Sequence, residues 1–436
     1  MKLKRGKELK SEISLTWDEI KKHNKKFDCW LVIDGNVYDI TRWADLHPGG
    51  QILCSLAGED ATVFFKSSHL ADVTPYLAQF RIGRVVGYQP QFDFDKDQFL
   101  AVLQRRVKQY FDLCQLEYRN TRKLRFQVAF SIALFFLCWY AAYFLGSWTA
   151  TVAMGLISCA MVGGFAHEYC HNTLFRDGNK TNLLSRLVSV LWAFLFPFML
   201  ERHFQYEHFK HHVSPMENDY DYEVFALRRF LRLADAVSYK PFFAYQKYYA
   251  PFVYAFYITI QVYDGFVGPY FDRREFRKDE SAFFQIYIMQ FVSILLHIAI
   301  PIYALGWLQW AGHFLLYNAV WQATTYYVAA TVHMTEPQET DSRIWSYRIC
   351  HYTTNVLCGN RFYDWLAGGF NYQIEHHLLP FISRENLPLV QEIVKATCRE
   401  FGYPYREYKS FWTYFRDHIA FLAAKGTPET AFAFKT

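Results

Sequence analysis

Charged side chains are missing from two long stretches of this 436-residue chain. No Asp, Glu, Lys or Arg occurs in residues 126–166 or in residues 281–335. A helix that crosses a bilayer needs about 20 apolar residues, so each stretch is long enough for two helices, with breaks at Gly146 and Pro301. Runs of this length are rare in the cores of soluble proteins. The sequence therefore predicts four membrane spans, at roughly 126–146, 148–166, 281–302 and 306–328.

A secretory signal, a paired-cysteine motif and a concentrated basic region are also missing. Residues 1–26 are rich in Lys and Glu and contain no apolar segment, so we expect the N-terminus in the cytosol. The nine cysteines include no Cys-x-x-Cys motif, which favours reduced thiols in a protein that faces the cytosol. The net charge of +5 is spread along the chain, with basic pairs beside the apolar stretches. This pattern predicts anchoring at a membrane and no nucleic-acid binding.

Histidine is concentrated in three short boxes. The chain has 16 histidines, and seven of them lie in these boxes: His167, His171, His208, His211, His212, His376 and His377. Spacings of three and four residues place side chains on one face of a helix. Imidazole clusters without cysteine suit zinc, copper, iron or nickel, and seven nitrogens exceed the four ligands of a usual zinc site. The boxes therefore predict a two-metal site that carries out oxygen chemistry.

Residues 14–90 have the pattern of a small, separate α+β domain. Two short β runs flank a turn within residues 30–40, and His47-Pro-Gly-Gly then opens a helical stretch that leads to His69. Two histidines on separate helical hairpins can bind one haem iron from opposite sides, which makes an electron carrier with no open site. The motifs that begin at Trp30, His47 and Leu56 resemble cytochrome b5. The resemblance implies a bound haem b with His47 and His69 as its axial ligands.

The rest of the chain is divided by its polarity. Residues 91–121 are expected to form a polar helical linker, and residues 122–420 an all-α membrane domain with a cap of histidine boxes. An even number of predicted spans precedes every box. All the boxes and both termini are therefore expected on the cytosolic side of the membrane. The sequon Asn179-Lys-Thr181 is then predicted to carry no glycan.

Three ordered boxes, four spans and a haem domain together resemble the membrane fatty acyl desaturases over residues 20–415. The third box begins with Gln373, and in this it resembles the third box of the front-end subgroup. Enzymes of this subgroup insert a cis double bond between an existing one and the carboxyl end of a polyunsaturated chain. The resemblance implies two iron ions, O2, and electrons from NADH through a separate cytochrome b5 reductase. It also implies a fatty acyl substrate on coenzyme A or a phospholipid, and residence in the endoplasmic reticulum membrane.

The resemblance implies roles for individual side chains. The expected iron ligands are the seven box histidines and His333, which resembles an extra histidine that precedes the third box. Gln373 is expected to act at the metal directly or through water. Glu168 and Cys170 stand where the subgroup usually has aspartate and glycine, which leaves the substrate and the position of the new double bond open. The expected catalytic set is His167, His171, His208, His211, His212, Gln373, His376 and His377.

Other side chains support weaker predictions. Two histidines within apolar stretches are expected to be hydrogen-bonded in the core: His297 and His313. Those expected at the surface are His23, His351 and His418, whereas His203 is a candidate neighbour of the ligands. Carboxylates that either orient ligands or are solvated are Glu168, Asp219, Asp221, Glu336 and Glu375, with solvation favoured for Asp219 and Asp221. Three aromatic residues are candidates for the lining of an acyl tunnel, although a position facing lipid or in the core is favoured for most of them: Trp192, Trp321 and Tyr326.

Three alternative functions stay open at this point. The same metal centre could act on a sphingolipid long-chain base, or it could hydroxylate a lipid. In a third alternative, the chain is a non-catalytic membrane haem protein, although its intact boxes argue against that.

Overall fold

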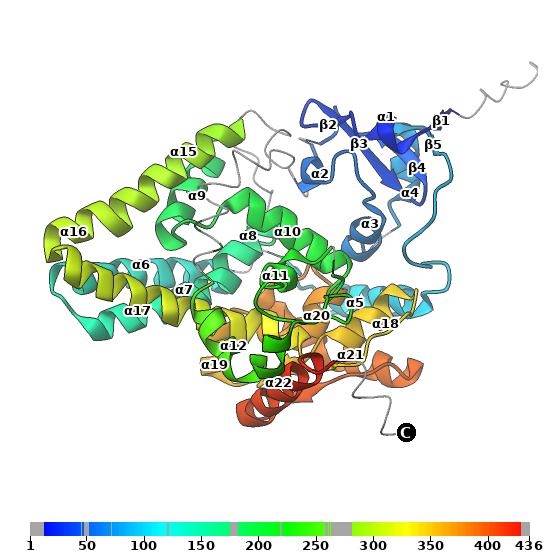
Figure 1. Ribbon diagram of the computed structural model, residues 1–436. Coiled ribbons are helices and arrows are strands. Elements are labelled where there is room, and N and C mark those ends of the chain that lie inside the picture. The colour runs from blue at the N-terminus through cyan, green and yellow to red at the C-terminus, as the bar shows by residue number, and fades with distance from the viewer. Residues whose placement is uncertain are drawn as a thin grey trace, which may run out of the picture. The chain divides into compact units, whose positions relative to one another are not determined.

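The computed structural model describes residues 13–428 except 45, 48–51, 71, 120–121, 175–181, 219, 258–259, 261 and 263–280. The sequon Asn179–Thr181 and the carboxylate of Asp219, both subjects of predictions, lie outside the described residues. The chain divides into two compact units. One unit ends at Gln91 and the other begins at Phe92, and Figure 1 shows the elements of both.

The first unit is built on a five-stranded sheet with the strand order β1-β5-β4-β3-β2. Its strands are β1 (Ser14–Leu15), β2 (Asn24–Lys25), β3 (Asp28–Ile33), β4 (Asn36–Asp39) and β5 (Arg81–Val85). β3 and β4 form an antiparallel hairpin, and its turn holds Asp34 and Gly35 at positive φ, as tight hairpin turns require. The helices are α1 (Trp17–Ile20), α2 (Ile52–Ser55), α3 (Thr62–Ser68), α4 (Thr74–Leu77) and the 3-10 turn η1 (Ala78–Phe80). The predicted α+β class of this unit is confirmed.

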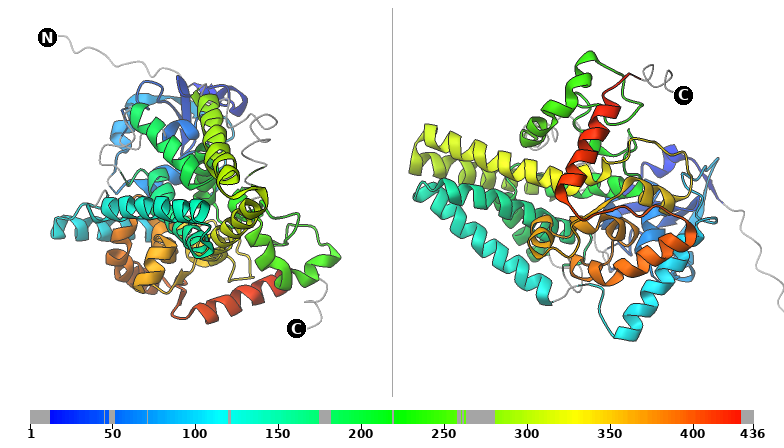
Figure 2. Two further views of the ribbon diagram at one scale, coloured as in Figure 1. Left: turned by 90° about the vertical axis from the view of Figure 1, so that its left-hand side faces the viewer. Right: turned by 90° about the horizontal axis from the view of Figure 1, so that it is seen from below.

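The second unit is helical, and its apolar part contains long helices that pack side by side (Figures 1 and 2). These elements are α6 (Arg122–Phe144), α7 (Trp148–Met161), α15 (Ser281–Ile294), α16 (Ile300–Leu305) and α17 (Trp307–Thr325). Side-chain hydrogen bonds join this part of the unit at two points. The Trp139 indole donates to the Leu296 carbonyl at 3.1 Å, and the Thr151 hydroxyl lies 2.6 Å from His313 Nδ1.

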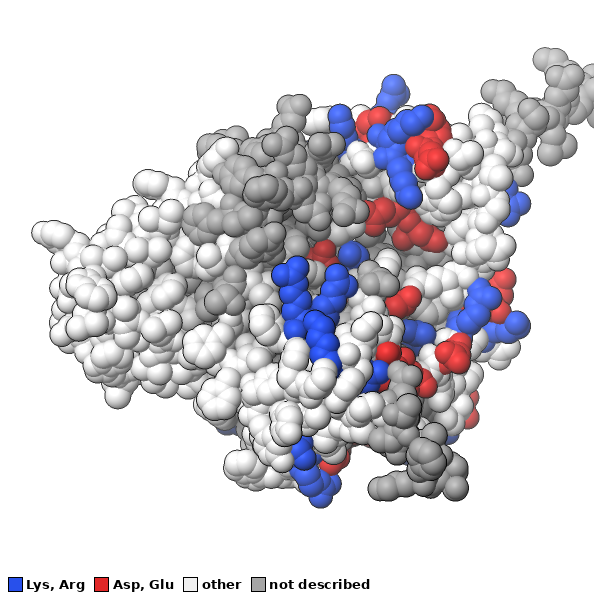
Figure 3. All heavy atoms as spheres, in the orientation of Figure 1, with Lys and Arg blue, Asp and Glu red and all other residues white. Residues whose placement is uncertain are grey.

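Three segments of the described chain have the length and hydropathy to cross a membrane: Arg122–Phe144, Trp148–Cys170 and Ile286–Leu305. They coincide with three of the four predicted spans. The element at the fourth predicted position is α17, which has 19 residues. Its buried polar side chains, including His313, Asn318 and Gln322, reduce its hydropathy. On the face drawn in Figure 3, the end of the bundle around α16 and α17 has no charged side chains.

Further helices make up the rest of the second unit in the described part of the chain. They are α5 (Gln98–Cys114), α8 (Glu168–Cys170), α9 (Asn182–Leu195), α10 (Glu201–Val213), α11 (Tyr222–Phe225), α12 (Gln246–Ala255), α18 (Trp345–Tyr352), α19 (Arg361–Ala367), α20 (Gln373–Leu378), α21 (Leu387–Phe401) and α22 (Phe411–Lys425). The predicted linker region contains α5, which packs on α21. Arg106 donates to Thr397 at 3.0 Å, and Phe99 stacks on Tyr403 with ring centroids 4.7 Å apart. A short parallel pair joins β6 (Asn355–Val356) to β7 (Glu407–Tyr408).

Wide π turns occur where two of the long helices approach the histidine boxes. η2 (Val162–His167) follows α7 directly, and η6 (Tyr326–Ala330) follows α17. Single π turns inside helices are rare and are frequent at functional sites, because they change the direction in which the following side chains point. Each of these turns leads into a segment with a candidate metal ligand.

The main chain of η2 is in direct contact with the main chain of the turn before α20. A Cβ atom added at Gly163 would lie 2.7 Å from the Gly368 carbonyl oxygen and 2.8 Å from its Cα. Gly368 itself has φ +60°, and a Cβ there would lie 2.7 Å from the Gly163 Cα. No other residue type fits either position without moving the backbone. The pair brings the backbone segments that lead into the first and third boxes into direct contact.

Candidate metal centre

The eight candidate ligand histidines converge in the second unit and form two groups. The larger group, here the five-histidine group, consists of His167, His171, His208, His212 and His376. The smaller, three-histidine group consists of His211, His333 and His377. Within each group, the ring nitrogens lie within 4.8 Å of one another. Every predicted iron ligand in this chain therefore takes part in one of the two groups.

The five-histidine group is assembled from three parts of the chain. His167 closes the π turn η2, and its Nε2 lies 2.8 Å from Nε2 of His376 on α20. His208 and His212 are one turn apart on α10, so both project from the same face. Their Nε2 atoms lie 3.0 Å apart, and Nε2 of His171 lies 3.0 Å from that of His208. Four Nε2 contacts of about 3 Å thus link all five rings, counting the 2.9 Å contact between His212 and His376.

The three-histidine group has fewer rings, and two of them are oriented by outer hydrogen bonds. His211 Nδ1 lies 2.9 Å from a carboxylate oxygen of Asp221, and His333 Nδ1 donates to the Tyr352 carbonyl at 3.0 Å. Since a carboxylate and a carbonyl only accept, both Nδ1 atoms carry the proton and both Nε2 lone pairs face the group. The two Nε2 atoms are 3.2 Å apart, and the ring of His377 lies 4.9 Å from each of the other rings.

Asp221 corrects a prediction from the sequence. It was expected to be solvated, but its side chain is buried at 1% exposure. Its carboxylate also accepts hydrogen bonds from the backbone N–H groups of Met216, at 2.8 Å, and Val224, at 3.3 Å. The expectation was wrong because Asp221 caps the short helix α11, and this cap carries the carboxylate over the end of α10, beside His211.

The donor atoms fit a pair of iron ions. Seven of the eight histidines are buried and His171 is partly exposed. Both nitrogens of His377 and Nδ1 of His212 have no hydrogen-bond partner. Burial, reinforced by the neighbouring imidazoles, lowers the pKa of His212, His376 and His377 well below the usual 6.5. These side chains are therefore neutral and offer lone pairs at physiological pH. Unpaired, neutral nitrogens in an enclosed space are costly unless a cation binds them.

An apolar cavity of about 120 Å³ adjoins the histidines. Phe204 and Phe370 belong to its wall, and each also contacts a ligand ring. Phe204 stacks on His208 at 5.5 Å, and Phe370 lies 4.6 Å from His167. Trp321 lines the cavity and its indole nitrogen is buried without a partner. The cavity has the mainly apolar lining that suits an acyl chain.

Of the aromatic residues predicted for a tunnel or the core, Trp321 and Tyr326 line this cavity, and Trp192 is fully buried. His203, the candidate neighbour of the ligands, also belongs to the wall.

Gln373 lies beside the cavity and is buried. Its amide nitrogen donates to the Ala329 carbonyl at 3.4 Å, and its Oε1 has no hydrogen-bond partner. This oxygen is thus available to a metal-bound ligand or water.

The other singled-out carboxylates hold protein segments together. Glu168 accepts from the Thr173 hydroxyl at 2.7 Å and from the Arg384 backbone N–H at 2.9 Å. Glu375 accepts from the Tyr405 hydroxyl at 2.5 Å and from the Asn355 amide at 2.7 Å. Burial raises the pKa of Glu375 to about 7. 

Glu336, the last of the singled-out carboxylates, pairs with Arg406 at 2.9 Å. These contacts fix the backbones on which the boxes sit.

The remaining histidines divide into confirmed and wrong predictions. His297 and His313 are buried and hydrogen-bonded, to the Phe194 carbonyl at 2.7 Å and to Thr151 respectively, as predicted. His418 was expected at the surface, but it is fully buried. It lies on α22, whose inward face contacts the segment around His333. Periodicity along residues 414–425 was the available signal, because Tyr414, His418 and Leu422 recur one turn apart.

In the first unit, His47 and His69 face each other with ring centroids 6.1 Å apart. His69 Nδ1 donates to the Phe65 carbonyl at 2.8 Å, which fixes the ring orientation and places the lone pair on Nε2. The imidazole pair, together with the surrounding aromatic side chains of Trp43 and Phe65, fits a flat group bound between two nitrogen ligands.

Comparisons with known proteins agree with this architecture. The "Fatty acid desaturase" family model matches residues 142–409, more than half of the chain, and the "Cytochrome b5-like Heme/Steroid binding domain" model matches residues 16–86. The chain is 26% identical to the acyl-lipid (8-3)-desaturase of Physcomitrium patens, over 95% of this chain and 92% of that protein. It is 29% identical to fatty acid desaturase 3 of Bos taurus, over 95% and 94%. It is 23% identical to Delta(5) fatty acid desaturase A of Dictyostelium discoideum, over 94% and 93%. The chain therefore belongs to the fatty acid desaturase family, with a cytochrome b5-like domain in front of its helical desaturase domain.

Proposed function

We propose that this protein is a front-end desaturase that inserts a cis double bond into a polyunsaturated fatty acyl chain, between an existing double bond and the carboxyl end. The observation that carries the proposal is the convergence of eight histidines into two groups beside an apolar cavity. The names of the (8-3)- and Delta(5) desaturases among its relatives support a polyunsaturated acyl substrate.

The proposed iron ligands are the members of the two groups: His167, His171, His208, His212 and His376 for one ion, and His211, His333 and His377 for the other. Gln373 acts at the metal centre directly or through water, by means of its unpartnered Oε1. Asp221 orients His211 and favours the tautomer that presents Nε2 to the metal. His47 and His69 are the proposed axial ligands of haem b.

Bound iron would supply the oxidising power that an unactivated C–H bond requires, with O2 as the oxidant. The reaction removes two hydrogens from adjacent methylenes, and O2 leaves as two waters after it has also taken up two electrons and two protons. The apolar cavity wall keeps the acyl chain extended beside the histidines and excludes water from it. The electrons come from NADH through cytochrome b5 reductase and the haem, and one polypeptide makes the last transfer intramolecular.

The proposed setting is the endoplasmic reticulum membrane. Three apolar helices and α17, whose polar side chains are turned inward, serve as four spans. Both termini and all the boxes then lie on the cytosolic side, where the reductase is. The acyl substrate arrives on coenzyme A or a phospholipid.

Expression in yeast that is fed a panel of polyunsaturated acids tests the proposal. Lipid analysis of the fatty-acid fraction should show one new double bond on the carboxyl side of an existing one, and a His212→Ala variant should lack it. A new hydroxyl group, or a change only in the sphingoid fraction, would contradict the proposed reaction. Unchanged lipids in both fractions, from a folded protein that contains haem, would contradict catalysis altogether.

A further inference from the structure

We propose that α22 is a positioning element for the metal ligand His333, and that His418 is its central contact. The inference rests on the proposed function, because it takes His333 as a ligand. α22 begins at Phe411, beyond residues 142–409, which the desaturase family model matches.

One face of α22 contacts the chain both before and after His333. Tyr414 donates to the Tyr327 carbonyl at 2.9 Å and bonds to the hydroxyl of Thr331, both before His333. His418 bonds to the Met334 carbonyl at 3.1 Å, directly after it. Lys425 is a third residue of α22 that contacts this segment. Tyr414, His418 and Lys425 are separated by four and seven residues, which puts them on one helix face.

The ligand needs such support because its own backbone is irregular. His333 ends the short 3-10 turn η7 (Thr331–His333), and residues 334–344 after it are in neither helix nor strand. In contrast, His211 and His377 lie on the α-helices α10 and α20, where backbone hydrogen bonds to residues four positions away hold them in place. The position of His333 therefore depends on contacts with other elements.

Burial and hydrogen bonding make His418 suitable for this role. It is fully buried, and burial lowers its pKa to about 4, so it is neutral at physiological pH. The Met334 carbonyl can only accept, so Nδ1 carries the proton and Nε2 accepts from the Tyr254 hydroxyl at 3.1 Å. Tyr254 in turn stacks on Tyr326 with ring centroids 4.4 Å apart. Both ring nitrogens are thus satisfied, and the imidazole joins α12 to the carbonyl beside the ligand.

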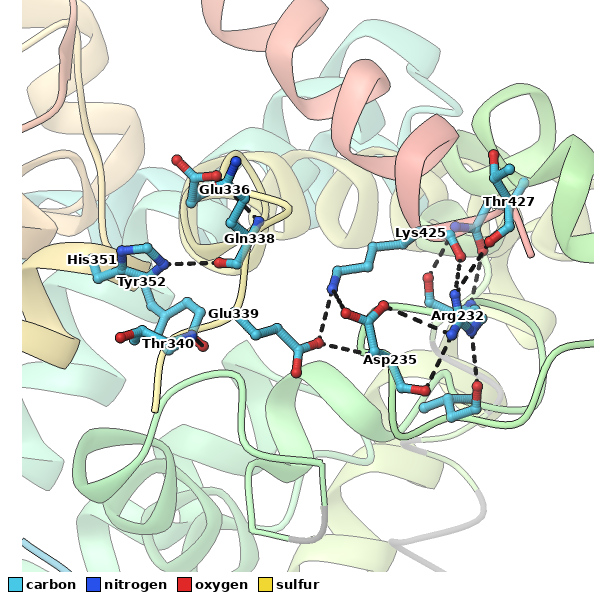
Figure 4. A network of polar contacts seen from close by, with 12 residues as sticks. Arg232, Asp235, Glu336, Gln338, Glu339, Thr340, His351, Tyr352, Lys425 and Thr427 are labelled. Carbon is cyan, nitrogen blue, oxygen red and sulfur yellow. Dashed lines mark hydrogen bonds and ion pairs between the residues drawn. The ribbon is translucent and has the colours of Figure 1, made fainter. Parts of the chain in front are cut away.

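Lys425 anchors the far end of the segment, as Figure 4 shows. Lys425 is 3% exposed, and its ammonium group lies 2.8 Å from carboxylate oxygens of both Glu339 and Asp235. The guanidinium of Arg232 donates to four main-chain carbonyls around this point: Val237 at 2.8 Å, Lys425 at 2.9 Å, Asp235 at 3.1 Å and Thr427 at 3.5 Å. Lys425 is buried, whereas its carboxylate partners Asp235 and Glu339 are 49% and 43% exposed, so this ion pair lies at the edge of the protein interior. The end of α22 cannot move away from Glu339 without breaking the contact between Glu339 and Lys425.

Iron content of the purified full-length protein tests the inference. His418→Phe keeps the ring volume but removes the donor to Met334, whereas His418→Asn retains an N–H near the position of Nδ1. We expect non-haem iron to fall from two ions per chain to one in His418→Phe and to stay at two in His418→Asn, with haem unchanged in both. Amide hydrogen exchange in residues 331–340 should accelerate about tenfold in His418→Phe, as expected for the loss of a buried hydrogen bond.

His297→Phe is the matched control, because His297 is another buried histidine that bonds to a carbonyl, but it lies outside the α22 contacts. It should retain two non-haem ions. If His418→Phe does not fold, Tyr414→Phe removes a single hydroxyl and should accelerate the same exchange. Two ions and unchanged exchange in His418→Phe, or equal iron loss in His297→Phe, would overturn the inference. Wild-type protein without non-haem iron would instead contradict the proposed function.

Discussion

The two histidine groups lie side by side but are held in different ways. The five-histidine group takes its rings mainly from helices and a π turn, and many ring contacts support one another. The three-histidine group has fewer donors, and its orientation depends on Asp221, on a main-chain carbonyl and on α22. A metal site with many ligands tolerates the loss of one, whereas a site with few depends on its surroundings. The smaller group should therefore be the more sensitive half of the centre.

The largest effect should come from the two neighbouring histidines of α20, which belong to different groups. His376→Ala and His377→Ala should each lower desaturation by at least about 100-fold, since a direct ligand matters more than its outer partners. Only His377→Ala should lose an iron ion from the purified protein, because four ligands remain around the other ion. Lipid analysis and metal content measure the two effects, and equal iron loss in both variants would break the comparison.

Replacement of the carboxylate that orients His211 should have the next largest effect. Asp221→Asn removes the charge but keeps the shape, and activity should fall about 10- to 100-fold, as for other outer partners of metal ligands. The exposed carboxylate of Asp341 provides a control, and Asp341→Asn should retain wild-type activity. Iron content measured alongside should fall toward one ion per chain in Asp221→Asn alone. Full activity in this variant would show that the smaller group does not depend on its carboxylate.

Low pH should weaken the support of the smaller group through His418. The pKa of this side chain is about 4 when folded and about 6.5 when unfolded, so only the unfolded state takes up the proton between these values. His418 is therefore neutral in both states above pH 7, and its contribution to the free energy of unfolding falls by roughly 2 kcal/mol at pH 5.

The metal-free protein allows a direct measurement of that loss. The thermal midpoint of the wild type should fall more between pH 7 and pH 5 than the midpoint of His418→Phe, which has no imidazole at this position. Parallel curves for the two proteins would contradict a buried, neutral His418.

Removal of iron by a chelator should show the smallest difference between the two histidine groups. The ion held by three histidines should leave at a chelator concentration about tenfold lower than the ion held by five, because it has fewer nitrogen donors. Iron released in two steps, with activity lost in the first, is the expected result. A single step would mean that the two ions bind as one unit.

The sequence predicted the parts of this centre that depend on local spacing. Box residues such as His208 and His212 are one helical turn apart, so their convergence follows from the helix itself. Local motifs likewise predicted the haem-ligand pair His47 and His69 and the small α+β unit. His333 has no such local signal, and only its resemblance to a family pattern pointed to it.

The missed contacts come from chain segments that meet only after folding. Asp221 is ten residues from His211, across a turn and a new helix cap, and no period connects them. His418 meets Met334 across 84 residues. The π turns before His167 and His333 were not predicted, because their sequences are as apolar as the helices that precede them. The fourth span was placed by its lack of charge, but α17 carries polar side chains that face inward.

The glycine contact between η2 and the turn before α20 has a consequence for how such an enzyme can diversify. Gly163 and Gly368 hold the backbone segments that lead into the first and third boxes in main-chain contact, so neither glycine can be replaced without moving the backbone. Changes in chain length or double-bond position are then expected among the side chains of the cavity wall, such as Phe204 of α10 and Trp321 of α17. Redesign of selectivity should begin at this wall, because substitutions in it leave the main-chain contact untouched.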